Sequence, residues 1–271
     1  MTAPLTADDL KPRDASKLYW AFADAAVLTR RHLIQIPRIP ELMVFATIQP
    51  IMLVLLFRYV FSGSIDVGNE SYVNYLMAGI FVQTVAFGGV VTGIGLAGDL
   101  QLGLIDRFRS LPMSRSAVLT GRTVADLVRN MCVVVVMLVV GILVGFRPDA
   151  SALDWVAAIG LLLLLSFAFS WVAAVVGLLA RSVEAAQSGG FIWLFPLSFA
   201  SSAFVKPENM SGWLQPFAEN QPFTVIVNAV RSLFLDLPMG NDGWLSVAWL
   251  VGLLIVFAPL SVRLYEKRTA G

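Results

Sequence analysis

The most informative group of charged side chains in this sequence lies between residues 99 and 122, in DLQLGLIDRFRSLPMSRSAVLTGR. Its first half alternates apolar residues with Asp106, Arg107 and Arg109, which predicts a short amphipathic helix over 100–111 that ends at Pro112. A surface helix with one apolar and one charged face suits docking to a soluble partner protein. The alternative is that this helix only caps a bundle of helices.

The remaining polar residues offer little catalytic chemistry. A single Cys and a single His exclude a disulfide framework, a zinc site of clustered ligands and a Cys/His catalytic pair. The pattern G-x-x-x-x-G-K-[ST] does not occur, so the chain cannot bind ATP through a P-loop. Asp126 and Arg129 are expected to pair with each other or with Arg122. We therefore expect no catalytic, cofactor-binding or metal-binding residue in this chain.

The elements that carry these residues are predicted to be membrane spans. Apolar residues make up 58% of the chain and charged residues 14%, and the mean hydropathy is +0.78, which is too apolar for a soluble fold of this size. A spanning helix needs about 20 mostly apolar residues. Six stretches qualify, at 42–61, 72–98, 118–146, 155–180, 186–204 and 244–262. The sequence thus predicts an all-α, polytopic membrane protein with a single transmembrane domain, 1–271, made of an N-terminal segment (1–41), six spans (42–262) and a tail (263–271).

Two further helices are predicted outside the spans. Residues 15–36 place apolar and basic side chains on different faces, which is typical of a helix in the membrane interface, although packing on a partner protein would give the same pattern. Within the loop 205–243, the amphipathic stretch Phe223–Leu235 is too short to cross a bilayer. A re-entrant or outer-surface helix fits this stretch better.

The distribution of Lys and Arg predicts the orientation of the spans. Basic residues gather before the first span, in the 99–117 loop and the start of the next helix, at Arg181, and after the last span. The alternate loops 62–71, 147–154 and 205–243 carry few. Because cytoplasmic loops are enriched in basic residues, six spans with both termini in the cytoplasm account for the pattern. We therefore expect a multi-pass protein of the cell (inner or plasma) membrane.

Three residues in or near the spans are candidates for a substrate path. Arg58 lies near the outer end of the first span, where its guanidinium could reach the outer headgroups or could line a path. Trp171 and Trp193 lie deeper and could line a path for an apolar substrate or pack in the core.

The pattern Gly89-x-x-x-Gly93 permits close helix contact, either in a dimer interface or within one subunit.

The charged segment also carries a recognisable pattern, G-x-x-[DE]-R-x-R-x-x-P-x-x-R-x-x-x-L-x-x-R, and a second one follows in WLQPFAENQPFTVIVNAVRSLFLD. Together they resemble the type-2 ABC exporter permeases, and the daunorubicin-resistance-like drug and lipid exporters look nearest. The resemblance covers nearly the whole chain. Gln101 departs from it, since many members carry an acidic residue at that position. The residues that match the family are Gly103, Asp106, Arg107, Arg109, Leu111, Pro112, Ser114, Arg115, Leu119 and Arg122 in the first segment, and Trp213, Pro216, Phe217, Asn220, Pro222 and Arg231 in the second.

This resemblance implies a permease subunit for export of a hydrophobic drug, lipid or lipid-like compound. A second permease, identical or paralogous, would complete the path, and two ATPase subunits would hold the ATP and Mg²⁺. Membrane lipids would be further partners, whereas nucleic acid would not bind. The residues implied to dock the ATPase through the cytoplasmic coupling helix are Gly103, Leu104, Asp106, Arg107, Phe108, Arg109 and Pro112, and those implied at the extracellular re-entrant gate are Trp213, Pro216, Phe217, Asn220, Pro222 and Arg231. The alternatives are a membrane tethering protein without transport and an integral membrane enzyme.

Overall fold

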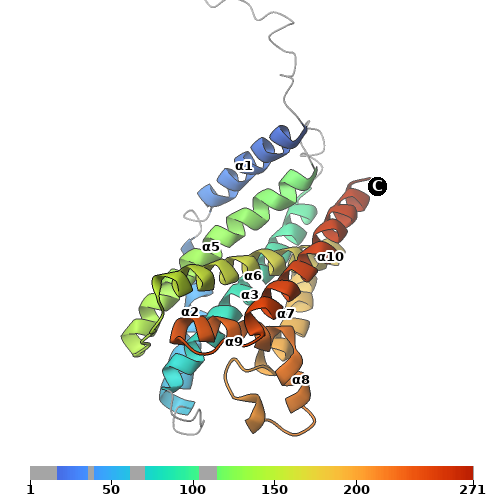
Figure 1. Ribbon diagram of the computed structural model, residues 1–271. Helices are drawn as coiled ribbons and strands as arrows, with labels where there is room; N and C mark the ends of the chain where they lie inside the picture. Colours follow the sequence, from blue (N-terminus) through green and yellow to red (C-terminus); the bar gives the residue numbers. More distant parts are fainter. Residues whose placement is uncertain (1–16, 36–39, 62–70, 104–114, 271) are drawn as a thin grey trace, which may run out of the picture.

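The computed structural model describes residues 17–35, 40–61, 71–103 and 115–270, and every regular element in these ranges is helical (Figure 1). The all-α architecture expected from the apolar runs is therefore confirmed for the described chain. The elements in chain order are α1 (Lys17–Gln35), α2 (Pro40–Leu56), a π-helical turn η2 (Phe57–Phe61), α3 (Tyr72–Gln101), α5 (Arg115–Val144), α6 (Ala152–Leu179), α7 (Val183–Phe199), a 3-10 turn η3 (Pro207–Asn209), α8 (Gln215–Asn220), α9 (Pro222–Leu235) and α10 (Asp242–Ala270).

Four helices among the described residues, α3, α5, α6 and α10, are long and apolar enough to cross a membrane. The chain is therefore a multi-pass membrane protein. The two other predicted spans correspond to α2 with η2 and to α7, both of which are shorter. The predicted tail differs in one respect, because α10 continues as a helix to Ala270.

Helix α3 is the centre of the bundle and packs most extensively against α6. Small residues make this approach possible. A Cβ at Gly93 would overlap the backbone of Ala173, and one at Gly177 would overlap the backbone of Gly93 itself. A Cβ at Gly89 would lie 3.1 Å from the backbone of Phe169 on α6. The Gly89-x-x-x-Gly93 pattern therefore serves packing within one subunit.

Helix α1 lies along the first part of α5, at the same end of the molecule as the end of α10 (Figure 1). The two helices meet at Gly121, where a Cβ would come within 2.8 Å of the Leu28 side chain. The Thr29 hydroxyl donates to the Gly121 carbonyl at 3.1 Å, and Leu28 is buried in a small apolar cluster with Leu119 and Trp171. The helix predicted over 15–36 therefore forms, with one face against the bundle and Val27 exposed.

The opposite end of the molecule is formed by η3, α8 and α9, which connect α7 to α10. The short helix predicted at Phe223–Leu235 corresponds to α9. It is buried over most of its length, since it contacts α3, α6 and α10. Its polar side chains Thr224, Asn228 and Arg231 form hydrogen bonds within the fold and line a polar cavity at this end of the molecule.

Candidate functional site

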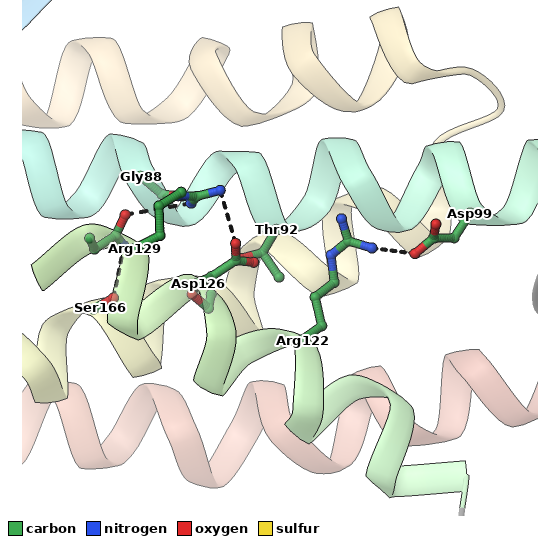
Figure 2. Close-up of polar contacts among 9 residues, drawn as sticks. Gly88, Thr92, Asp99, Arg122, Asp126, Arg129 and Ser166 are labelled. Atoms are coloured by element: carbon green, nitrogen blue, oxygen red, sulfur yellow. Dashed lines mark hydrogen bonds and ion pairs between the residues drawn. The ribbon is translucent and has the colours of Figure 1, made fainter. Parts of the chain in front are cut away.

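A network of polar side chains crosses the inside of the bundle between α5, α3 and α6 (Figure 2). On α5, Arg129 Nη1 lies 2.9 Å from Asp126 Oδ1, and its Nη2 donates to the Gly88 carbonyl of α3 at 2.8 Å. The Thr92 hydroxyl of α3 donates to Asp126 Oδ2 at 2.6 Å. The i, i+3 spacing on one helix therefore brings both charges together, as the sequence predicted.

Further polar contacts lie on both sides of this network. Asn130 donates through Nδ2 to the Ser166 hydroxyl of α6 at 2.8 Å. A side chain at Gly88 would overlap Asn130, so this glycine gives Asn130 its place between the helices. Toward the α1 end, Arg122 forms an ion pair with Asp99 of α3. Arg122 was one of the two partners proposed for Asp126, but the structure pairs it with Asp99 instead.

The Asp126–Arg129 pair is nearly removed from solvent, with side chains 12% and 13% exposed. Taking two charges into a low-dielectric bundle costs several kcal/mol per ion, and the cost is met only when partners and hydrogen bonds surround both. Here the carboxylate accepts from Thr92 and the guanidinium donates to a backbone carbonyl. The pair as a unit therefore carries no net charge.

A cavity of about 140 Å³ opens beside this network, between α2, α3, α5 and α7. Arg129 and Asn130 form part of its wall. Two aromatic rings, Phe87 and Phe191, lie 5.7 Å apart between centroids on another part of the wall. The remaining lining residues are all uncharged and mostly apolar: Ala46, Gln49, Pro50, Leu53, Gln83, Thr84, Gly88, Val91 and Val133.

The chemistry of this cavity is that of a binding site for an amphiphilic molecule. Pockets for small molecules are mostly apolar with a few placed polar groups, but for drug-sized ligands they measure ~300–1,000 Å³. A volume of about 140 Å³ fits one ring or one short chain segment. The cavity could thus hold part of a ligand whose remainder extends beyond it.

Arg231 organises the other end of the bundle. It is buried on α9, and its guanidinium donates to the carbonyls of Tyr75 (3.2 Å) and Ser202 (2.6 Å) and to the Asn228 amide oxygen (3.0 Å). The guanidinium carbon lies 3.7 Å from the centroid of the Tyr75 ring. A polar cavity of about 480 Å³ borders this cluster, with Lys206 and Glu208 among its lining residues.

The other residues predicted at this end are not gathered around Arg231. Trp213 is 82% exposed and Phe217 52% exposed. Asn220 donates to the Pro216 carbonyl at 2.9 Å, and Pro222 is the first residue of α9. The two prolines and Asn220 therefore shape the turns around α8, whereas Arg231 joins α9 to α3.

The three candidate path residues lie outside the wall of the 140 Å³ cavity. Trp171 is buried in the apolar cluster beneath α1, and Trp193 packs on Phe169 with centroids 5.7 Å apart. Arg58 lies in the π-helical turn η2. In the described chain, Arg58 Nε and both indole nitrogens are buried without a hydrogen-bond partner.

Most of the predicted docking segment, including Leu104, Asp106, Arg107, Phe108, Arg109 and Pro112, lies outside the described residues. Gly103 is described and has φ +64°, a left-handed conformation that glycine adopts without strain. It follows α3, which runs to Gln101, so residues 100 and 101 belong to α3 and not to a separate helix.

His32 of α1 lies close enough to Arg122 for the two charges to interact. Burial of the His32 imidazole lowers its pKa, and the Arg122 guanidinium lowers it further.

The cavity residues were not identified from the sequence. Gln83 gives the clearest signal, because an amide inside an otherwise apolar span needs a partner, and here it donates to the Ser198 hydroxyl at 3.4 Å. Phe87, Phe191 and Gln49 carry no such signal. They meet only because three helices pack in one particular register.

Comparison with known proteins places this architecture in a family. Residues 24–235 match the family model described as ABC-2 type transporter. The chain is 33% identical over 252 residues to the daunorubicin resistance ABC transporter permease protein DrrB1 of Streptomyces coeruleorubidus, covering 92% of this chain and 89% of that protein. It is 27% identical to the probable doxorubicin resistance ABC transporter permease protein DrrC of Mycobacterium tuberculosis (78% and 79% covered), and 24% identical to the putative transport permease ycf38 of Porphyra purpurea (85% and 81% covered). The chain therefore belongs to the ABC-2 type transporter family, as a permease of an ABC transporter.

Proposed function

We propose that this chain is the transmembrane permease of an exporter that moves a hydrophobic drug, lipid or lipid-like compound out of the cytoplasm or the inner leaflet. The cavity between α2, α3, α5 and α7 is the observation that carries this proposal. It offers aromatic and aliphatic walls with a few hydrogen-bonding groups inside the bundle. The printed names of two relatives, which concern daunorubicin and doxorubicin resistance, support the same class of cargo.

The proposed arrangement in the membrane has six spans. Helix α2 with η2, and α7, complete the four long helices, and both termini lie in the cytoplasm because the basic residues gather on that side. Helices α8 and α9 then lie at the outer side. Arg231 supports a re-entrant role for α9, because backbone carbonyls and an amide satisfy its buried charge away from lipid.

The energy for transport would come from partner subunits. The chain has no P-loop, so ATP and Mg²⁺ would bind to two separate ABC ATPase subunits beneath a pair of permeases. The segment after Gly103, with Phe108 and Arg109, would seat in the ATPase. Since α3 and α5 flank this segment and are joined by the Asp99–Arg122 and Asp126–Thr92 contacts, a push on it would move both helices together.

The proposal is tested by export and assembly together. Phe108→Ala should weaken docking of the ATPase by ~1–3 kcal/mol, and Arg109→Glu should act similarly by placing the wrong charge against the partner. Copurification of the ATPase and ATP-driven export should both fall, while membrane insertion stays normal. Leu153→Ala is the control, because Leu153 is 76% exposed at the start of α6 and belongs to none of the proposed sites. ATP hydrolysis by the purified chain alone would contradict the proposal.

A further inference from the structure

We infer that the cavity between α2, α3, α5 and α7 admits uncharged amphiphiles in preference to anionic ones, and that Asp126 sets this selectivity from behind the wall. This inference rests on the proposed function, since it concerns the cargo of the same cavity. Asp126 is thus a positioning residue, which acts on the ligand through Arg129.

The charge balance of the wall is the first step. Arg129 is the charged side chain among the described lining residues, and Asp126 is not part of the lining. An arginine in an apolar cavity would by itself attract a carboxylate or a phosphate. Here its Nη1 already lies 2.9 Å from Asp126, and its Nη2 donates to the Gly88 carbonyl. The cavity therefore presents a hydrogen-bond donor without presenting a net positive charge.

The cost of admitting an anion follows from this balance. A bound carboxylate would have to draw Arg129 away from Asp126, which would leave Asp126 buried and uncompensated, or it would add a second negative charge beside the pair. The Thr92 hydroxyl of α3 donates to Asp126 Oδ2 at 2.6 Å, so the carboxylate cannot follow the guanidinium without losing that bond.

An uncharged ligand meets no such cost. A hydroxyl or carbonyl oxygen can accept a hydrogen bond from the guanidinium, and it can also bond to the amides of Gln83 and Gln49, which line the same cavity. The apolar remainder can lie against Phe87 and Phe191. The geometry therefore favours a neutral head and an apolar body.

A matched pair of photoreactive probes tests the inference: a diazirine-bearing long-chain alcohol and the carboxylic acid of the same chain. The full-length protein in phosphatidylcholine nanodiscs is labelled at alkaline pH, where the acid is ionised, and labelled peptides are mapped. Peptides with Gln49, Phe87 and Phe191 should carry the alcohol at least about tenfold more than the acid, because an uncompensated buried charge costs more than the corresponding free energy.

Variants at Gln49 change the charge of the wall without touching the ion pair. Gln49 is exposed on α2, so substitutions there are compatible with folding. Gln49→Lys adds an uncompensated cation and should raise labelling by the acid about tenfold, whereas the control Gln49→Met should leave the preference for the alcohol unchanged. Asp126→Asn should act like Gln49→Lys, and the charge-neutral double variant Asp126→Asn/Arg129→Gln should not.

The outcomes separate this inference from the proposed function. Equal labelling of the cavity by both probes, unchanged in Gln49→Lys, would overturn the charge selectivity and leave the cavity as a ligand site. Labelling of lipid-facing peptides alone by both probes would overturn the cavity as a ligand site and with it the selectivity.

Discussion

Two arginines join helices inside this bundle, and they are stabilised in different ways. Arg129, between α5 and α3, is paired with a carboxylate one helical turn away. Arg231, between α9 and α3, is surrounded by the carbonyls of Tyr75 and Ser202, the Asn228 amide and the Tyr75 ring. The first borders a small and mostly apolar cavity, and the second borders a larger polar one.

The difference follows from the groups that surround each guanidinium. The cavity wall beside Arg129 is mostly apolar, so this guanidinium needs a full counter-charge, because dipoles alone recover too little of its hydration energy. Beside the polar cavity at Arg231, which Glu208 and Glu219 also line, water and carboxylates can add to the carbonyl dipoles and the ring face. The central arginine should therefore depend on one partner, and the outer one on many.

Removing the carboxylate partner of Arg129 should have the largest effect. Asp126→Leu leaves a buried guanidinium uncompensated and should lower the free energy of unfolding by about 3–5 kcal/mol. The double variant Asp126→Leu/Arg129→Met removes both charges and should recover most of this loss. Chemical unfolding in detergent measures both. A single variant as stable as the double variant would contradict the role assigned to the pair.

Removing Arg231 should cost less. Arg231→Met deprives the Ser202 and Tyr75 carbonyls of a donor, which should cost about 2–3 kcal/mol, and water from the neighbouring cavity should limit the loss. Lys206→Met is the control, since Lys206 lines the same cavity but is only half-buried. If Arg231→Met proved more damaging than Asp126→Leu, the contrast between the two arginines would be wrong.

A smaller effect is expected where α1 joins the end of the bundle near Arg122. Gly121→Val would force the added methyl groups against Leu28 and the α1 backbone, at a cost of about 1–3 kcal/mol. Hydrogen exchange of the α1 amides should become faster while that of α6 does not. Gly160→Val is the matched control, because nothing lies within 4 Å of a Cβ at Gly160. Equal protection of α1 in both variants would contradict the close packing at Gly121.

The smallest effect concerns pH. Burial lowers the pKa of His32 in the folded protein, and the positive charge of Arg122 lowers it further. The negative charges of Asp99 and Asp126 raise it by less, so the pKa stays below its ordinary value. A detached α1 would then bind more protons, so its docking is strongest above the ordinary His pKa and weakens as pH falls through that value toward the folded pKa. Exchange of the α1 amides, corrected for intrinsic rates, should rise on acidification in the wild type and not in His32→Gln.

The long helices could be predicted because each coincides with a local apolar or amphipathic run of sequence. The Asp126–Arg129 pair could be predicted because both residues lie within one helical turn. What joins the helices could not be predicted this way. The bond from Thr92 to Asp126 spans 34 residues and depends on the register of α3 against α5. The contact of Gly93 with Gly177 depends in the same way on α6. The amphipathic pattern of α9 indicated a helix, but its burial by three other helices is a property of the packed fold.

Transport through a filled cavity tests the central claim most directly. In inside-out vesicles that contain the permease with its ABC ATPase, Ala46→Phe would place a ring in the cavity from its α2 wall, whereas Val247→Phe would add the same ring to the exposed surface of α10. With both complexes assembled, ATP-driven uptake should fall about tenfold or more in Ala46→Phe, the equivalent of losing ~1.4 kcal/mol of binding, and stay unchanged in Val247→Phe. Equal uptake by the two variants would contradict the account that this cavity carries the cargo.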